Sequence, residues 1–205
     1  MLLREAAILE RGGGRLLPRS HGVFPYESPR GMWTESDGRP LLVMELVVGG
    51  RPRSIGDVRR VFGALTEHVR SGELDYHGDL KPEHIFIGDR IRLVDPAPRF
   101  PDGRTRAYTP EYNPHGLAGP PADVFAIAVL LYMVIARVEP FADARRLEPV
   151  GEASKPPPPV ARGRTGVPAD LSAAVDELLG SGGQVPHWAT THESALDRIF
   201  GSSTD

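Results

Sequence analysis

Residues 76–96 read "YHGDLKPEHIFIGDRIRLVDP", and this stretch decides the fold. An aspartate stands two positions after a histidine, followed by a lysine and then by a second histidine. Two short β-branched runs, "HIFIG" and "IRLVD", come next and are separated only by "DR", which predicts a small two-stranded ribbon. Because such a ribbon folds back on itself, we expect the polar residues before it and the aspartate at its end to lie close together.

The polar groups of this stretch suit one kind of chemistry. Phosphoryl transfer needs a carboxylate that orients the attacking hydroxyl, ligands for Mg²⁺, and cations that hold the nucleotide phosphates. Groups of these kinds stand at Asp79, Lys81, His84 and Asp95. A lone aspartate or histidine in a loop is usually solvated or caps a turn, so the prediction depends on the spacing of the whole set.

The composition and net charge limit the size class of the protein and the partners that it could bind. The chain has 205 residues and 40% hydrophobic content, enough for one domain or for a small lobe joined to a larger one. A net charge of -3, from 24 basic and 27 acidic residues, gives no field that would gather nucleic acid or anionic lipid, so we expect neither partner. The absence of cysteine excludes disulfides and thiolate metal sites.

The chain shows no signal for export or for membrane insertion. Its start, "MLLREAAILERGG", carries charge early and lacks an apolar run long enough for a signal peptide. The longest apolar run, at residues 124–136, is well short of the roughly 20 residues that cross a bilayer. We therefore expect a cytoplasmic protein with no membrane partner.

Periodicity predicts the elements before the opening stretch. Residues 2–10 have helical spacing, and the triple glycine that follows ends the helix. Residues 31–50 are typical of a hairpin, with a short strand, a turn at "SDG", and an apolar strand from Leu41 to Val48. A helix is predicted within residues 54–72, with an apolar stripe from Ile55 to Val69 and Ser54 as its cap.

Periodicity also predicts the elements after it. Residues 121–138 read as a helix that is buried on all sides, and residues 152–166 as a proline-rich surface loop. A helix begins at "PADL" with an aspartate cap and ends at Gly180, and a last short helix covers residues 192–200.

Specific motifs now point to a family. "HGDLKPEHIFI" resembles the catalytic loop His-Arg-Asp-Leu-Lys-x-x-Asn of eukaryotic-type protein kinases, a superfamily that includes bacterial Ser/Thr kinases. "RLVDPA" falls where that family has its metal-binding Asp-Phe-Gly. The resemblance implies ATP and Mg²⁺ as cofactors, with Asp79 as the catalytic carboxylate and Lys81 as its phosphate-contacting neighbour. It also implies His84 and Asp95 as metal ligands.

Further motifs extend the resemblance to nearly the whole chain. "YTPEYNPHG" is similar to the end of an activation segment, with Thr109 near the substrate hydroxyl. "ADVFAIAVLLYMVIARVEPF" resembles the central helix of the large lobe, in which Asp123 would brace the catalytic loop, and His77 would pack under that loop. "LLVMELVVGG" resembles the hinge strand, so Met44 and Glu45 would bind the nucleotide. In "REAAILE", which resembles the small-lobe helix, Glu5 would pair with a lysine.

The resemblance implies an α+β, protein kinase-like fold. Residues 1–50 would form a reduced small lobe of one helix, a hairpin and the hinge strand, and residues 51–205 a mainly helical large lobe. The family's glycine-rich strand pair and strand lysine would precede "REAAILE" and have no counterpart in this sequence. A complementing segment or partner chain over the nucleotide site is therefore one expectation. Gly78 and His115 also depart from the family pattern, which has an arginine and a glutamate there.

Three functions stay open at this point. Asp79 and Asp95 favour ATP- and Mg²⁺-dependent phosphoryl transfer to protein Ser or Thr. The missing strand lysine favours a catalytically dead pseudokinase that acts as a binding module. "HGDL" and His84 suggest a small-molecule phosphotransferase, although the central helix and "TPEYNP" look more like protein kinases. The expected partner is accordingly a protein substrate or a protein binding partner.

Overall fold

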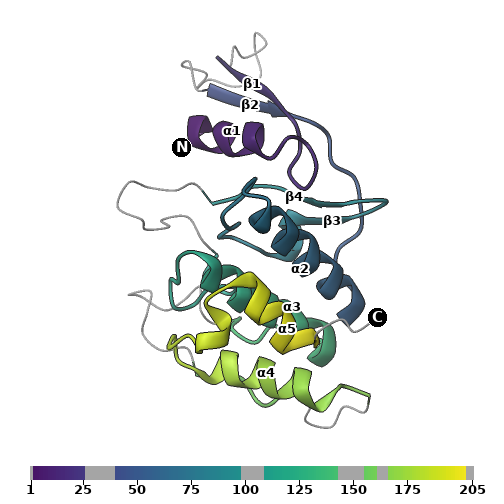
Figure 1. Ribbon diagram of the computed structural model, residues 1–205, viewed down its shortest axis with the longest axis vertical. Helices are drawn as coiled ribbons and strands as arrows, with labels where there is room; N and C mark the ends of the chain where they lie inside the picture. Colours follow the sequence, from purple (N-terminus) through teal and green to yellow (C-terminus); the bar gives the residue numbers. More distant parts are fainter. Residues whose placement is uncertain (1, 26–39, 98–108, 143–154, 161–165, 202–205) are drawn as a thin grey trace.

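A computed structural model of the chain describes residues 2–25, 40–97, 109–142, 155–160 and 166–201. This part of the chain combines helices with two small two-stranded sheets, which confirms the predicted α+β class. Figure 1 shows three levels, with α1 and the first sheet at one end, the second sheet and α2 in the middle, and the remaining helices at the other end. None of the described helices has the length and apolar character that a membrane span requires.

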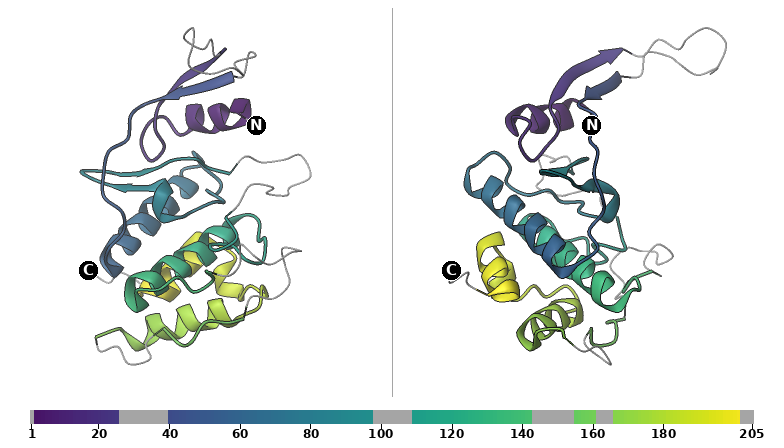
Figure 2. Two further views of the ribbon diagram at one scale, coloured as in Figure 1. Left: turned by 180° about the vertical axis from the view of Figure 1, so that it is seen from behind. Right: turned by 90° about the vertical axis from the view of Figure 1, so that its right-hand side faces the viewer.

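The N-terminal level consists of one helix and one sheet. Helix α1 (Leu2–Arg11) ends as predicted at the triple glycine, where Gly13 and Gly14 take positive φ angles of 57° and 76°. Strand β1 (Ser20–Pro25) pairs antiparallel with β2 (Pro40–Met44). Helix α1 lies between this sheet and the second one (Figures 1 and 2).

The hairpin differs from the sequence prediction in two ways. The described partner of β2 is β1, whereas the predicted partner strand and its "SDG" turn fall within residues 31–39, outside the described residues. Strand β2 also ends at Met44 rather than at Val48, because the chain then leaves β1 and runs toward the second sheet. There Gly50 exchanges backbone hydrogen bonds of 2.9 and 2.8 Å with Ile87.

Helix α2 (Ile55–Arg70) begins at the predicted cap. The Ser54 hydroxyl accepts a hydrogen bond from the Asp57 N–H at 3.1 Å, and the Asp57 carboxylate accepts one from the Ser54 N–H at 3.1 Å. This reciprocal pair satisfies two N–H groups that the helix leaves unpaired.

The predicted ribbon is confirmed as the second sheet. A short 3₁₀ turn, η1 (Pro82–His84), leads into β3 (Ile85–Ile87), which pairs antiparallel with β4 (Ile91–Leu93). The loop after α1 docks on β4, since the Leu93 N–H donates to the Leu16 carbonyl at 2.9 Å.

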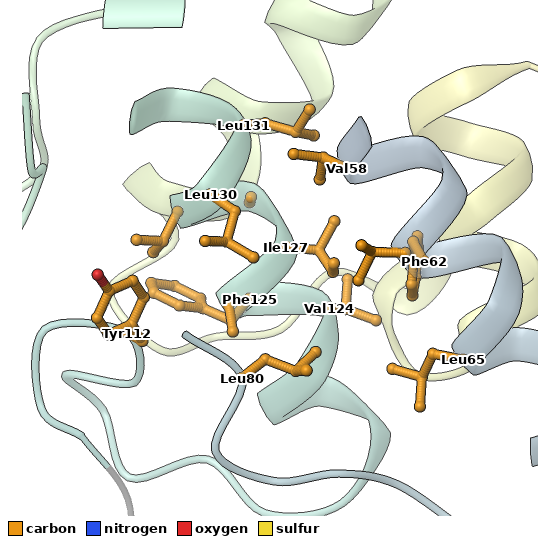
Figure 3. Close-up of a cluster of buried hydrophobic side chains, with 14 of the residues drawn as sticks. Val58, Phe62, Leu65, Leu80, Tyr112, Val124, Phe125, Ile127, Leu130 and Leu131 are labelled. Carbon is orange, nitrogen blue, oxygen red and sulfur yellow. The ribbon is translucent and has the colours of Figure 1, made fainter. Parts of the chain in front are cut away.

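The core is built around α3 (Pro120–Ala136), which is apolar on all sides as predicted. Side chains of α2 pack against it, and Figure 3 shows Phe62 and Leu65 of α2 beside Val124 and Ile127 of α3. Leu80, from the loop before η1, is buried in the same cluster. The loop of interest is thus anchored directly to the core.

Two helices cover the other side of α3. Helix α4 (Ala169–Gly180) ends as predicted, but its N-cap residue is Pro168, with no side-chain cap. The expected aspartate cap is wrong, because Asp170 lies inside the first turn. After the 3₁₀ turn η3 (His187–Ala189), α5 (His192–Phe200) packs against α2 and α3.

Candidate functional site

The loop that carries the candidate site is held from beneath by Asp123, in the first turn of α3. The Asp123 carboxylate is fully buried and accepts backbone hydrogen bonds of 2.7 Å from both His77 and Gly78. It also accepts a hydrogen bond from Nε2 of His192, on α5, at 3.0 Å. Three donors therefore satisfy one buried charge, as a buried carboxylate requires.

Gly78 is the residue that this backbone path needs. Its φ is +86°, and a Cβ atom at this position would lie 2.9 Å from Cβ of Ala97 and 3.1 Å from the ring of Tyr76. Any other side chain would force the loop away from Asp123. The glycine at position 78 thus has a local steric reason in this chain.

His77 joins the loop to the strand that ends at Asp95. Its ring is fully buried, Nε2 donates to the Val94 carbonyl at 3.0 Å, and Nδ1 accepts from the Asp79 N–H at 3.3 Å. Both contacts fit the same neutral ring, and burial lowers the pKa of His77 and favours that form. His77 therefore fixes the backbone at Asp79 relative to the end of β4.

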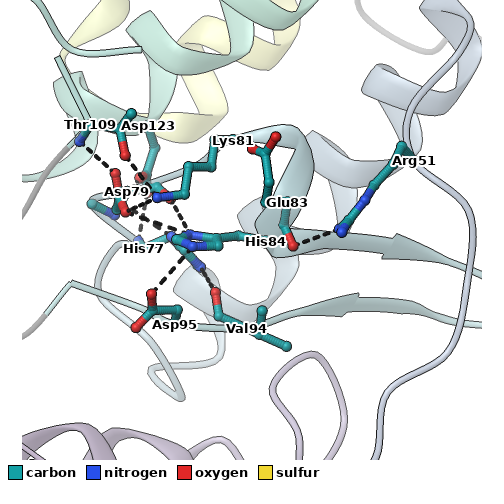
Figure 4. A network of polar contacts seen from close by, with 11 residues as sticks. Arg51, His77, Asp79, Lys81, Glu83, His84, Val94, Asp95, Thr109 and Asp123 are labelled. Carbon is teal, nitrogen blue, oxygen red and sulfur yellow. Dashed lines mark hydrogen bonds and ion pairs between the residues drawn. The ribbon is translucent and has the colours of Figure 1, made fainter. Parts of the chain in front are cut away.

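The Asp79 carboxylate contacts Thr109 and Lys81, and its Oδ2 also lies 3.6 Å from Nδ1 of His84 (Figure 4). Oδ1 accepts a hydrogen bond from the Thr109 N–H at 2.8 Å, and Oδ2 lies 3.1 Å from Nζ of Lys81. Lys81 Nζ also donates to the Thr109 hydroxyl at 2.8 Å. The carboxylate is mostly buried, so this triangle holds it in one orientation.

His84 stands between the two aspartates. Its Nδ1 lies 2.8 Å from the backbone carbonyl of Asp79, and its Nε2 lies 3.2 Å from Oδ2 of Asp95. The contact with His84 is the main reason that the pKa of Asp95 lies below its ordinary value, so this carboxylate is charged at neutral pH. Ligand atoms of Asp79, His84 and Asp95 all lie within 4.8 Å of one another.

Asp95 has an unusual backbone. Its φ of 56° lies in the left-handed region, which costs a non-glycine residue about 1 kcal/mol, although aspartate tolerates it better than most. Pro96, the next residue, is buried, and the Ala97 N–H donates to the His77 carbonyl at 2.8 Å. The flanking chain therefore holds Asp95 in this conformation, with its carboxylate at His84 and mostly exposed.

The expected nucleotide-side residues do not join this cluster. The Glu45 carboxylate lies 3.2 Å from Arg92 of β4 and accepts a hydrogen bond from the Arg19 N–H at 3.2 Å. Met44 packs, half-buried, against the core. Glu5 is largely buried on α1, and burial, reinforced by Asp95, raises its pKa. Within the described residues, no cation pairs with Glu5.

Sequence reasoning missed three residues that support the site. Arg92 donates to backbone carbonyls of the loop after α1, at Gly14, Arg15 and Leu17. Arg51 donates to the carbonyls of Glu83 and Ile85, which holds η1 in place. His192 completes the set around Asp123. The only sequence signal was an arginine inside the apolar run "IRLVD", where a charge needs buried partners.

Two carboxylates and one imidazole in this arrangement form a chemically reasonable site for a divalent cation. Within the described part of the chain, this is the only group of three such side chains. Asp95 leaves part of its carboxylate open to solvent, which an ion that also contacts a substrate requires. The residues present therefore fit a divalent cation, which phosphoryl transfer requires.

The sequence is similar over part of its length to curated proteins. It is 34% identical, over 133 aligned residues, to serine/threonine-protein kinase PknL of Mycobacterium tuberculosis, and equally to the protein of that name from Mycobacterium bovis. The match covers 51% of this chain but only 33% of each relative, so the chain spans about a third of the length of the curated relatives it matches. No protein-family model matches the sequence. The partial identity supports a kinase-like relationship.

Proposed function

We propose that this chain is a kinase-like module that transfers the γ-phosphate of ATP to a serine or threonine hydroxyl of a protein. One observation carries the proposal, namely the convergence of Asp79, His84 and Asp95 on one point. Asp79 comes from the loop before η1, His84 from η1 itself, and Asp95 from the chain just after β4. The partial identity with serine/threonine-protein kinases supports the same chemistry.

Asp79 is the proposed catalytic carboxylate. The substrate hydroxyl oxygen forms a bond to the γ-phosphorus, while the bond between that phosphorus and the bridging oxygen breaks and its electron pair leaves with ADP. The hydroxyl proton passes to Asp79, which the bonds to Thr109 and Lys81 already hold in one orientation. This preorganisation is what such a base requires.

Lys81 and Thr109 have supporting roles in the proposal. The Lys81 ammonium lies against Asp79, where it would also attract a phosphate oxygen. Thr109 ties the segment that would present the substrate to the same carboxylate. His77 and Asp123 hold the loop backbone from below.

Asp95 and His84 would hold a divalent cation. When bound, the cation would neutralise negative charge on the nucleotide phosphates. For the chain as a whole, we propose that residues 1–50 form a reduced small lobe and residues 51–205 the large lobe, with the segment from Met44 to Gly50 as the hinge beside the adenine.

A second candidate is a binding module without turnover, and Glu5 favours it. A largely buried carboxylate without a cation is unfavourable, and no described residue supplies one. A lysine or arginine from a complementing segment or partner chain would satisfy it. The module would then function in the complex, with the partner over the nucleotide site.

Phosphate transfer from labelled ATP to a library of Ser/Thr peptides tests the first candidate. The wild-type chain is expected to transfer label, and Asp79→Asn to lose about 10²-fold or more of the rate. Asp197→Asn, an exposed change on α5, is the matched control and should behave like wild type. Equal signals from wild type and Asp79→Asn would remove the proposal and leave the binding module.

A further inference from the structure

The ring of His84 faces oxygen acceptors on both sides. Nδ1 lies 2.8 Å from the Asp79 carbonyl, an oxygen that can only accept, so the N–H must be on Nδ1. The other ring nitrogen, Nε2, lies 3.2 Å from Oδ2 of Asp95. A contact of this kind is favourable when either a proton or a metal ion lies between the two atoms, and a third possible ligand, Asp79, lies nearby.

The spacing suits a metal ion in that position. Two ligand atoms 3.2 Å apart, each about 2.1 Å from a shared ion, subtend about 100° at it. This angle lies between those of neighbouring ligands in octahedral and tetrahedral geometry. The pair therefore needs little rearrangement to chelate an ion, and a carboxylate oxygen of Asp79 lies within 4.8 Å of both ligand atoms.

The chemical types of the ligand atoms determine which metal ion the site prefers. Mg²⁺ strongly prefers oxygen ligands and gives up water reluctantly, whereas imidazole nitrogen suits zinc and its neighbours in the first transition row. His84 is also more than nine-tenths buried and fixed through Nδ1, so its Nε2 cannot turn away and leave the ion to the carboxylates.

We propose that His84, Asp95 and Asp79 form a site selective for a transition-metal divalent cation, of the Co²⁺ and Zn²⁺ class, over Mg²⁺. The role of the bound ion, which is to assist phosphoryl transfer, rests on the proposed function. The ion would serve the same phosphate chemistry, but the chain would take a different metal from the Mg²⁺ that its motifs imply.

A second histidine in the chain provides an internal comparison. His68 has the same arrangement, with Nδ1 2.9 Å from the Ala64 carbonyl and Nε2 3.4 Å from Glu73. The other oxygen of Glu73 is paired with Arg15 at 3.0 Å, and no third ligand lies near it among the described residues. The His68 pair should bind such ions far more weakly.

Calorimetric titration of the untagged chain with Co²⁺ and with Mg²⁺, without nucleotide, tests the inference. We expect one tight Co²⁺ per chain, bound at least about tenfold more tightly than Mg²⁺, with visible absorption bands of nitrogen-ligated Co²⁺. Zn²⁺ should displace it. His84→Asn, which offers an amide oxygen, should keep Mg²⁺ binding and lose most of the preference, and Asp95→Asn should lose both ions.

The matched control is His68→Asn, which should bind both ions as wild type does. Equal affinity of the wild type for Co²⁺ and Mg²⁺, an unchanged preference in His84→Asn, or no binding of either ion would overturn the inference. Absence of binding would mean that a proton on Nε2 holds the pair together. Near-UV circular dichroism checks that the variants fold, and His84→Gln serves if His84→Asn does not.

The outcome is separable from that of the proposed function because no nucleotide is present. A chain that binds Co²⁺ selectively but transfers no phosphate contradicts only the proposed function. A chain that transfers phosphate but binds Mg²⁺ as tightly as Co²⁺ contradicts only the metal inference.

Discussion

His192, on the last helix, donates a hydrogen bond of 3.0 Å to Asp123, in the first turn of the central helix. Both side chains are buried, and the same carboxylate binds the backbone of the candidate catalytic loop at His77 and Gly78. The end of the chain is thus linked through one aspartate to the loop that carries Asp79. The loop's position depends on packing far from it in sequence.

Asp123→Asn should destabilise the protein strongly. The change removes the charge and turns an NH₂ group toward N–H donors, so buried partners lose their acceptor. We expect a loss of about 3–5 kcal/mol in the free energy of unfolding, measured by chemical denaturation. Asp197→Asn, at an exposed position, is the control. A loss below about 1 kcal/mol would show that Asp123 does not anchor the loop.

Arg92→Met should loosen the N-terminal level of the fold. The guanidinium of Arg92 holds carbonyls of the loop after α1 and the carboxylate of Glu45. Hydrogen exchange at residues 12–24 should become roughly tenfold faster, while α3 keeps its protection. Arg90→Met, in the exposed turn between β3 and β4, should change neither. Unchanged exchange in Arg92→Met would contradict this role.

Ser54→Ala should destabilise α2 by about 1 kcal/mol, because it removes the acceptor for the Asp57 N–H. Thermal unfolding measures the difference. Ser71→Ala at the other end of the helix, where the hydroxyl donates to the His68 carbonyl, should cost less. Equal effects of the two changes would argue against the capping box as the main signal for the helix.

His115 should make stability depend on pH. Its ring packs edge-on against Phe125, and burial lowers its pKa below the ordinary value of 6.5. The unfolded chain therefore binds a proton more readily, and the contribution of His115 to stability is present above about pH 6.5 and declines below it.

The matching variant is His115→Phe, which keeps a ring but cannot take up a proton. Between about pH 7.5 and pH 5.5, wild type should lose more stability than this variant, as followed by urea denaturation. Parallel losses in the two proteins would mean that burial of His115 has no part in the acid response.

The sequence predicted the elements with strong local signals. Helix α2 carries a capping box, α3 is apolar throughout, and "HIFIG" and "IRLVD" are β-branched runs separated by a turn. Each of these signals comes from residues that are close to one another in the sequence. The predicted meeting of the residues at 79 and 95 followed from the same ribbon, since its fold-back returns the chain to the loop.

The sequence could not predict features that depend on distant partners. Strand β1 carries a glycine at a bulge and a terminal proline, and it pairs with β2 across residues 26–39, so local propensity did not single it out. The side-chain contacts of Arg92 and His192 reach partners 47 or more residues away in the sequence. Nothing in the sequence near either residue indicates those partners.

The central claim is that the residues at 79, 84 and 95 form one site for nucleotide phosphates and a divalent cation. Melting temperature with and without ATP, in Mg²⁺ and in Co²⁺, tests it most directly, because a ligand that binds only the folded chain must stabilise it. A rise that requires both ATP and the cation, is absent in Asp95→Asn, and is kept in Asp197→Asn is the predicted result. The same rise in Asp95→Asn, or none in wild type, would contradict the account.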